Sequence, residues 1–311
     1  MDANPTLDQL QIFIAVADAG GFSAAARRLN RAQSVISYGI SNLEAQLQVQ
    51  LFDRDGTRVP QLTEAGRALL TDARRILAGL EGMRARAGGL RQGLEAEITL
   101  AVDVTVPAEA LAEVLRAFET EYPTVAIRLH VGALGVVYDQ VMRQLADLGI
   151  SGSATIEDET QIVTASVGAS SMIPVAAPDH PLAVAGTPVP PELVREQTQL
   201  VITDLTDQTR GKDFGVLSYR TWRLTDMGMK RALIAAGLGW GGLPYAMAQK
   251  DIQDGRLVWL DIESYPERAF PLYAIHHVRR TPGPATRWMI ERFRLALAAC
   301  DAHRDIARQS A

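Results

Sequence analysis

Apolar residues recur at intervals of three and four along residues 7–47, which is the spacing of helices that bury one face. Residues 7–18 place Leu10, Phe13, Ile14 and Ala17 on one side of a predicted amphipathic helix. The stretch FSAAARRLNRAQSVISYGISNLE, residues 22–44, predicts two further short helices joined by a tight turn. Three short helices in succession indicate a small helical domain at this end of the chain.

Within residues 22–44, Ser23 is expected to cap the first helix through its hydroxyl. The small residues Ala24, Ala25 and Ala26 allow two helices to cross closely. Asn30-Arg31 breaks the pattern, and a second helix runs from Ala32. Its expected buried side consists of Val35, Ile36, Ile40, Leu43 and Leu47, and its polar side of Gln33, Ser34, Ser37, Tyr38 and Ser41. Such a helix fits a DNA major groove, although this segment alone also fits an ordinary surface helical hairpin.

The next segment, LFDRDGTRVPQLTEAG at residues 51–66, predicts strand, turn, strand and helix start. Asp55-Gly56 is a hairpin turn signal, and Thr63-Glu64 is a helix N-terminus signal. Pro60 cannot donate to a ladder and suits an edge strand. A small hairpin behind a helix-turn-helix is a wing, which favours the DNA-binding interpretation.

Residues 65–94 predict one long helix that ends loosely at a hinge containing Gly88-Gly89 and Gly93. Its apolar residues follow alternating spacings of four and three, which is the seam of a paired helix. The seam consists of Leu69, Ala73, Ile76, Leu80, Met83, Ala87 and Leu90. Charged flanks favour an exposed helix that pairs with a second chain. The alternative is that the seam packs on its own domain.

From residue 96 onward, predicted strands and helices alternate, which indicates α/β lobes with a sheet covered by helices. Strands are expected at 96–106, 125–131, 148–152, 171–178, 199–204, 221–225 and 270–278, with helices at 107–122, 136–145, 226–236 and 284–299. Residues 237–244 predict a turn and strand, and residues 251–252 and 255–260 close the second lobe. Residues 270–299 are expected to return to the first lobe.

The sequence shows no catalytic or metal-binding motif: no P-loop, GxSxG, HExxH or CxxC is present. His276-His277 lies in a predicted strand, so the two side chains point to opposite faces and cannot chelate one metal ion. The glycine-rich Gly237–Gly242 segment follows a helix rather than a strand and therefore fails as a dinucleotide fingerprint. Cys300, the single cysteine, is interpreted as a buried structural thiol. We therefore expect no enzyme activity, metal or cofactor.

The net charge of −5 is unevenly distributed. Residues 1–64 carry −2, residues 65–94 carry +4, and the remainder carries −7. General attraction to phosphates should therefore be modest. DNA affinity would depend on locally placed arginines and on binding as an oligomer. The arginines concerned are Arg27, Arg28, Arg31, Arg54 and Arg58.

The chain resembles the LysR-type transcriptional regulators in three stretches: LDQLQIFIAVADAGGFSAAARRLNRAQSVIS, LEAQLQVQLFDR and LTEAGRALL. The resemblance implies a winged helix-turn-helix (1–64), a linker and dimerisation helix (65–94) and a two-lobed effector-binding domain (95–311) similar to periplasmic solute-binding proteins. Lobe I would comprise about 95–163 and 271–311, and lobe II about 164–270. Three departures limit transfer of an operator sequence: Ser37-Tyr38 replaces the usual Ser-Arg, Ala32 replaces the capping hydroxyl, and the wing is one residue longer.

Ligands of open α/β folds bind at the carboxyl ends of strands. The expected effector-binding residues at these ends are Asp103, Val104, Thr105, Gly132, Ala133, Ser151, Asp204, Leu205, Gly241 and Gly242. Helix N-termini near Thr105 and Ala133 favour a carboxylate. The carboxylates of Asp103 and Asp204 disfavour an anion, unless both are turn caps. The balance favours a neutral or weakly polar effector, and nearby Trp240 and Tyr245 suit an aromatic one.

These observations predict a DNA-binding regulator that acts as a homodimer or homotetramer. Expected DNA contacts come from Gln33, Ser34, Ser37, Tyr38 and Asn42 together with the five arginines. Expected partners are double-stranded DNA, a small-molecule effector and, for an activator, RNA polymerase, with no membrane. The N-terminus lacks the basic and apolar parts of a signal peptide, so a cytoplasmic protein is expected. The alternatives are a solute-binding component, opposed by the first 94 residues, and a cytoplasmic enzyme, opposed by the missing catalytic set.

Overall fold

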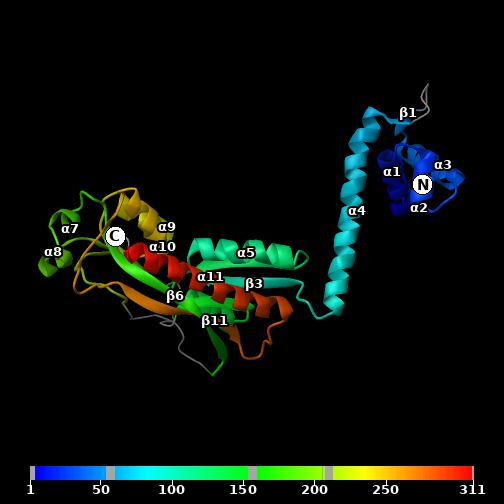
Figure 1. Cartoon of the computed structure of the whole chain (residues 1–311). Coiled ribbons are helices and arrows are strands. Elements are labelled where there is room, and N and C mark those ends of the chain that lie inside the picture. The colour runs from blue at the N-terminus through cyan, green and yellow to red at the C-terminus, as the bar shows by residue number, and fades with distance from the viewer. Residues whose placement is uncertain (1–3, 54–59, 153–159, 205, 207–212, 310–311) are drawn as a thin grey trace. The chain divides into compact units, whose positions relative to one another are not determined.

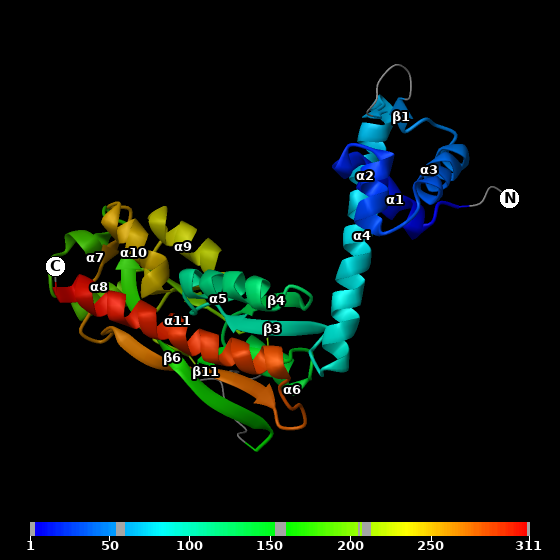
Figure 2. The ribbon, with the colours of Figure 1, turned by 45° about the vertical axis from the view of Figure 1, so that its right-hand side comes forward.

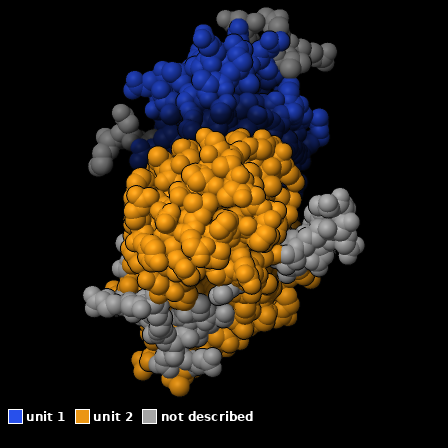
Figure 3. Space-filling view, turned by 90° about the vertical axis from the view of Figure 1, so that its left-hand side faces the viewer, with its two compact units in different colours: residues 1–88 blue, residues 89–311 orange. Residues whose placement is uncertain are grey.

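The computed structural model describes residues 4–53, 60–152, 160–204, 206 and 213–309, without the side chains of Arg268 and residues 301–309. The chain forms two compact units, residues 1–88 and residues 89–311, which Figure 3 colours separately. Each unit has its own hydrophobic core and is described by itself.

Unit 1 is a three-helix bundle with a small hairpin and the first part of a long helix (Figure 1). Its elements are α1 (Leu7–Ala19), α2 (Phe22–Leu29), α3 (Gln33–Leu47), β1 (Phe52–Asp53), β2 (Gln61–Leu62) and α4 (Glu64–Arg91). The predicted hairpin is confirmed, because β1 and β2 pair antiparallel. Its turn, with Asp55-Gly56, Arg54 and Arg58, lies outside the described residues.

The turn between α2 and α3 follows the predicted break at Asn30, which has a φ of 52° in the left-handed region. Ala25 and Ala26 are buried, so the small residues allow close helix contact as expected. Two predictions were wrong. Ser23 does not cap α2, because the N-cap is Gly21 and the Ser23 hydroxyl instead donates to Gln33 Oε1 at 2.8 Å. Val35 is 46% exposed, because the buried side of α3 begins one residue later, at Ile36.

Helix α4 begins as predicted at Thr63-Glu64, where Thr63 Oγ1 accepts a hydrogen bond from the Gly66 backbone N–H at 2.9 Å. A Cβ atom at Gly66 would lie 2.1 Å from the Leu51 carbonyl oxygen, so only glycine permits this close approach. The first turns of α4 therefore pack tightly on unit 1. Leu70 and Ala73 belong to the core of unit 1, and Leu69 packs against it half-buried.

Unit 2 is built on a seven-stranded mixed sheet of order β10-β6-β11-β5-β3-β4, with β9 also paired to β6. The strands are β3 (Glu97–Asp103), β4 (Ala126–Gly132), β5 (Leu148–Gly152), β6 (Ile162–Ala176), β9 (Gly241–Pro244), β10 (Val258–Trp259) and β11 (Arg268–His277). Helices α5 (Ala108–Glu121) and α11 (Pro284–Gln309) lie side by side along it (Figure 2). Helix α6 (Val136–Met142) packs on β3, β5 and β11. The first lobe therefore combines the parallel strands β3, β4 and β5 with these three helices.

The second lobe is formed by the remaining elements and joined to the first by two crossing strands. It contains α7 (Pro181–Val184), α8 (Pro191–Glu196), β7 (Gln199–Ile202), β8 (Thr221–Leu224), α9 (Met227–Ala235) and α10 (Tyr245–Gln253). Strand β6 pairs with β11 and then with β9 and β10, while β11 also pairs with β5. The predicted pair of lobes joined by crossing strands is therefore confirmed. Helices α7, α8 and α10 were not predicted, and β6 begins nine residues earlier than expected.

Candidate functional site

The outer face of α3 presents polar side chains next to the turn that precedes it. Gln33, Ser34 and Tyr38 are exposed, Tyr38 by 70%, whereas Ser37 and Asn42 are half-buried. The opposite side of α3 is buried: a Cβ atom at Gly39 would lie 2.8 Å from Ile12 Cδ1. Close packing of α3 on α1 through Gly39 therefore fixes which residues of α3 face outward.

The arginines around this face differ in whether a carboxylate already pairs with them. Arg31 pairs with Asp8 on α1 at 2.7 Å, and the hydrogen bond from Arg31 holds the Asp8 carboxyl pKa below its usual value. Arg28 lies 3.6 Å from Asp18, which also pairs with Arg74 on α4 at 2.5 Å. Arg27 is exposed and forms no ion pair with the described residues. Among Arg27, Arg28 and Arg31, only Arg27 has no described carboxylate beside it, so its charge is the most available for a phosphate.

The predicted seam of α4 divides into two parts. Leu69 and Ala73 contact the core of unit 1, as the alternative interpretation allowed. Further along, Ile76, Met83 and Leu90 are 49%, 62% and 50% exposed, Ala87 is exposed and Leu80 is half-buried. Exposed apolar residues at this spacing remain available to pair with another helix.

A cavity of about 450 Å³ lies between the two lobes of unit 2. Five of the predicted effector residues line it: Asp103, Val104, Thr105, Ala133 and Gly242. They come from loops after β3 and β4 and from β9, as the rule for strand ends predicts. The other lining residues include Met172, Gln199, Phe214, Met227, Lys230, Tyr265 and Phe270.

Four described residues predicted at the cavity do not line it, and Leu205 lies outside the described residues. Gly132 faces α6, because a Cβ atom there would lie 2.5 Å from Val136 Cγ1. Ser151 is fully buried. Gly241 faces the backbone of β7, with Leu200 O 2.7 Å from an added Cβ atom. Asp204 is turned into a hydrogen-bonded turn instead of the cavity.

Both aspartates that seemed to oppose an anion are turn caps. Asp103 Oδ1 accepts hydrogen bonds from Thr105 N at 2.9 Å and Thr105 Oγ1 at 2.6 Å. Burial raises the Asp103 pKa to about 6, against the lowering by these bonds. Asp204 accepts in the same way from Thr206, and its Oδ2 accepts from Gly135 N at 3.2 Å. The Asp204–Gly135 bond joins lobe II directly to lobe I.

The aromatic side chains that line the cavity differ from the two that the sequence suggested. Trp240 is fully buried, and its indole N–H donates to Ser218 Oγ at 3.0 Å. Tyr245 packs against Trp259 with ring centroids 6.0 Å apart. Neither lines the cavity. Trp240 contributes from behind, because its ring supports Tyr265 edge-on at 5.9 Å, and Tyr265 lines the cavity.

Lys230 is one of the cavity residues that the sequence analysis did not predict, and it is the basic residue among those that line the cavity. It is 4% exposed, and burial lowers its amine pKa to about 7. A signal was present, because Lys230 occupies the apolar side of α9, three residues after buried Met227 and four before buried Ile234. A lysine at such a position either extends to solvent or enters the interior.

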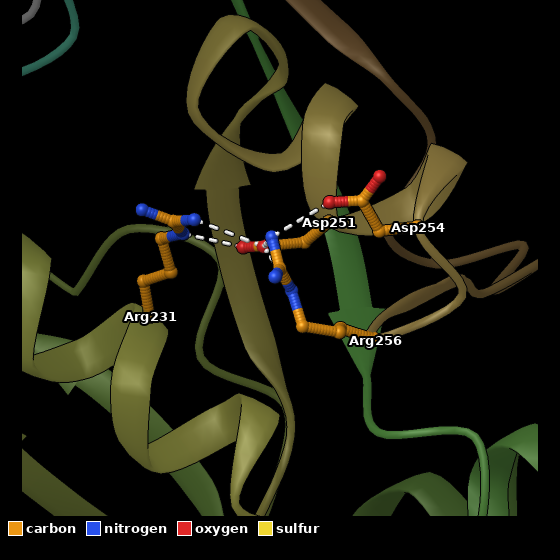
Figure 4. A network of polar contacts seen from close by, with 4 residues as sticks. All are labelled: Arg231, Asp251, Asp254 and Arg256. Carbon is orange, nitrogen blue, oxygen red and sulfur yellow. Dashed lines mark hydrogen bonds and ion pairs between the residues drawn. The ribbon is translucent and has the colours of Figure 1, made fainter.

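An ion network beside the cavity holds α9 in place (Figure 4). Arg231 on α9 forms a two-bond contact with the buried Asp251 carboxylate on α10. Arg256 donates to Asp251 Oδ1 at 2.8 Å and also pairs with Asp254 at 3.0 Å. The hydrogen bond from Arg231, with support from Arg256, keeps the Asp251 pKa below its usual value. Lys230 therefore lies on a helix that is held to α10 through the next residue, Arg231.

Among the described residues, no helix is long and apolar enough to cross a membrane. Within the same ranges, no group of three or more His, Cys, Asp or Glu side chains could hold a metal ion. The structure gathers polar groups at two places, the outer face of α3 and the cavity between the lobes of unit 2.

Comparison with known proteins identifies both units. Residues 7–67 match the bacterial regulatory helix-turn-helix protein, lysR family, and residues 91–298 match the LysR substrate binding domain. The probable HTH-type transcriptional regulator YhaJ of Escherichia coli K12 is 30% identical over 268 residues, covering 84% of this chain and 88% of that protein. The uncharacterized HTH-type transcriptional regulator YeeY of the same organism is 29% identical over 256 residues, covering 82% of each.

Solved structures agree on the fold. The Corynebacterium glutamicum OxyR C206 mutant has a TM-score of 0.53 at 21% identity, covering 97% of this chain and 96% of that one. Full-length LysG from the same organism has a TM-score of 0.51 at 18% identity, covering 95% and 99%. Together with the two domain matches, these findings show that the chain belongs to the LysR family of transcriptional regulators, which are not enzymes and combine a helix-turn-helix DNA-binding domain with an effector-binding domain.

Proposed function

We propose that the protein controls transcription in response to a small organic molecule that binds in the cavity between the lobes of unit 2. The observation that carries this proposal is a cavity of about 450 Å³ with walls from both lobes. That volume falls in the range of small-molecule sites. The Asp204–Gly135 hydrogen bond crosses from one lobe to the other, so a bound molecule and this bond would favour the same closed arrangement.

For DNA binding, the proposed contacts are the predicted ones: Gln33, Ser34, Ser37, Tyr38 and Asn42 toward the bases, with the arginines toward phosphates. The exposed polar face of α3 supports this assignment. Because Arg28 and Arg31 are already paired with aspartates, we expect Arg27 to contribute most of the phosphate attraction of these three arginines. Arg54 and Arg58 belong to the predicted wing.

For assembly, we propose a homodimer or homotetramer held by the exposed part of the α4 seam, from Ile76 to Leu90. A two-fold dimer would place two α3 helices on half-sites about one helical turn of DNA apart. An activating role would add contact with RNA polymerase. Because the target is chromosomal DNA, the working compartment would be the cytoplasm.

The effector site is tested by filling the cavity from two different segments, the loop after β4 and strand β11. Ala133→Trp and Ala269→Trp each replace a small lining residue, and Leu145→Trp adds the same side chain at an exposed position that does not line the cavity. The full-length proteins are compared by thermal shift against a library of anionic, cationic and neutral metabolite-sized compounds. Genomic DNA fragments selected by the wild-type protein then serve for binding assays with each hit.

Compounds that stabilise the wild-type and Leu145→Trp proteins should lose their effect in both cavity variants. All three variants should still bind the selected DNA, because unit 1 has its own core. Hits that stabilise Ala133→Trp and Ala269→Trp as strongly as the wild type would show that the ligand binds elsewhere and would refute the proposed site.

A further inference from the structure

Lys230 is a buried basic residue that has no partner among the residues that the structure describes. Its side chain is 4% exposed and lines the cavity, and no described residue gives it a hydrogen bond or an ion pair. The chain contains only three lysines among its 31 basic residues. An ammonium group removed from water without a counter-charge is strongly unfavourable. When Lys230 is protonated, the wall of the cavity therefore carries a positive charge that no described residue neutralises.

The acidic side chains of the cavity do not neutralise Lys230. Asp103 is occupied by Thr105, through the backbone N–H and the hydroxyl, and by a backbone hydrogen bond from Leu134. Asp213 pairs with Arg223 at 2.8 Å. Neither forms an ion pair with Lys230. In the described lining, the carboxylates have protein donors and the ammonium has no acceptor, so the missing group is an anion.

The position of Lys230 is defined by its surroundings. Helix α9 is capped by Asp226, whose side chain accepts from Met229 N, and is tied to α10 by Arg231 and Asp251 (Figure 4). A Cβ atom at Gly241 would lie 3.0 Å from Lys230 Cε, so the lysine stem passes against bare backbone of β9. A fixed stem holds the ammonium in one place, which a binding site requires.

The rest of the lining sets the shape and polarity of the molecule. Met172, Met227, Phe214 and Phe270 present apolar surface from four different segments of chain. Tyr265 lies over Gly242, where an added Cβ atom would be 2.1 Å from its hydroxyl. A ligand that fills this space has an apolar body beside one charged end.

We propose that the effector is a small organic anion with an apolar body, and that its carboxylate or equivalent group pairs with the Lys230 ammonium. This inference rests on the proposed effector cavity. It replaces the neutral or weakly polar molecule that the sequence favoured, because the two aspartates behind that expectation are turn caps and the lysine was not recognised.

The experiment uses matched probes that differ in charge. Short straight-chain carboxylates, benzoate and phenylacetate are each compared with their primary amide on the full-length protein at pH 7. Binding is followed by isothermal titration calorimetry and by tryptophan fluorescence. The variants are Lys230→Met, which keeps the length of the side chain, and Lys250→Met, a matched change at an exposed lysine of α10. Ala269→Trp reports whether each probe binds in the cavity.

The wild-type protein should bind at least one carboxylate about tenfold or more tightly than its amide, because a hydrogen bond to a charged partner contributes about that factor or more. Lys230→Met should weaken that carboxylate by about ten- to a hundredfold and leave the amide nearly unchanged. Lys250→Met should change neither.

Three results would overturn the inference. In the first, no carboxylate binds the wild type better than its amide. In the second, carboxylate binding survives Lys230→Met but is lost in Ala269→Trp, so the cavity is the effector site and Lys230 is not the group that binds the carboxylate. In the third, binding survives both variants, so the probes bind elsewhere and the proposed cavity fails as well.

Discussion

Lys230→Met should make the protein more stable while it impairs ligand recognition. The lysine is 4% exposed and has no partner among the described residues, so in the ligand-free protein its charge is a cost of folding. Methionine has a similar length, fits an apolar cavity wall and carries no charge. Stabilisation on removal of a buried polar group is typical of sites that bind ligands at the expense of stability.

The size of the effect follows from the pKa of Lys230. Burial lowers that pKa from 10.5 to about 7. At about 1.4 kcal/mol per pKa unit, a fall of this size corresponds to a penalty of roughly 5 kcal/mol when the amine is charged in both states. We take this as a ceiling, because denatured chains and side-chain relaxation reduce such values. The expected gain in the free energy of unfolding for Lys230→Met at pH 7 is about 2–4 kcal/mol.

The pH dependence of the free energy of unfolding tests the same buried lysine in a second way. Between about pH 7 and pH 10.5 the unfolded chain keeps the lysine proton that the folded chain has lost, so the stability of the wild type rises with pH in this window. Below it, both states are protonated and the whole penalty is present. Lys230→Met has no such group, so its advantage over the wild type should be largest near pH 7 and should shrink toward pH 10.

The assay is chemical denaturation followed by tryptophan fluorescence. All four tryptophans, at positions 222, 240, 259 and 288, belong to unit 2, so the signal reports the unfolding of that unit within the full chain. Lys250→Met is the matched control and should lie within about 0.5 kcal/mol of the wild type, as expected for a surface substitution. A Lys230→Met protein that is no more stable than the wild type, or that keeps the same rise in stability above pH 7, would refute the buried, unpaired charge.

Three further outcomes are expected. Asp251→Asn should lower the free energy of unfolding by about 1–2 kcal/mol at neutral pH, less than for a fully buried ion pair because Arg231 and Arg256 are 40% and 54% exposed. Since the Asp251 pKa is lowered, the stability that its ionised carboxylate contributes is present above about pH 4 and is lost as the pH falls through the folded-state pKa. A denaturation series in which Asp251→Asn loses as much stability at low pH as the wild type would contradict this prediction. Ile76→Asp with Leu80→Asp should shift the protein to smaller species in analytical ultracentrifugation, because charges would enter the proposed seam; an unchanged mass would mean that the seam does not hold the oligomer. Gln33→Ala should relax base preference at one position per half-site, by about 1–3 kcal/mol of discrimination, and an unaltered profile across single-base variants of the selected DNA would exclude Gln33 from base contact.

The local elements of unit 1 could be predicted because their signals lie within a few residues. The turn at Asn30, the helix start at Thr63 and the pairing of the wing strands follow from short-range periodicity and turn chemistry. Val35 was wrongly predicted to be buried, because two adjacent apolar residues at the start of a helix do not show which face of the helix is buried. The contact of Gly39 with Ile12 on another helix fixes the orientation of α3, so that Ile36 is buried and Val35 is exposed.

In unit 2, the sequence predicted the alternation of strands and helices but missed the helices α7, α8 and α10 and the full length of β6. The first nine residues of β6 are rich in small and polar side chains, and their strand conformation comes from pairing with β11, more than a hundred residues away in the chain. Helix α10 follows the glycine-rich Gly237–Pro244 segment directly, so the breaker signals obscured its start. Its packing on β6 and β9 and the ion pairs of Asp251 stabilise it.

The sequence alone determined the family, the alternation of strands and helices, and five residues of the cavity, because residues at strand ends such as Asp103 and Ala133 are recognised by their position along the chain. Which groups meet there was decided by the tertiary structure alone. Trp240 was expected beside the ligand and is sealed behind Tyr265, whereas Lys230 was hidden in a helix stripe and lines the cavity. The physical reason is that a side chain's charge state and partners depend on burial by segments distant in sequence, and no local pattern encodes that burial.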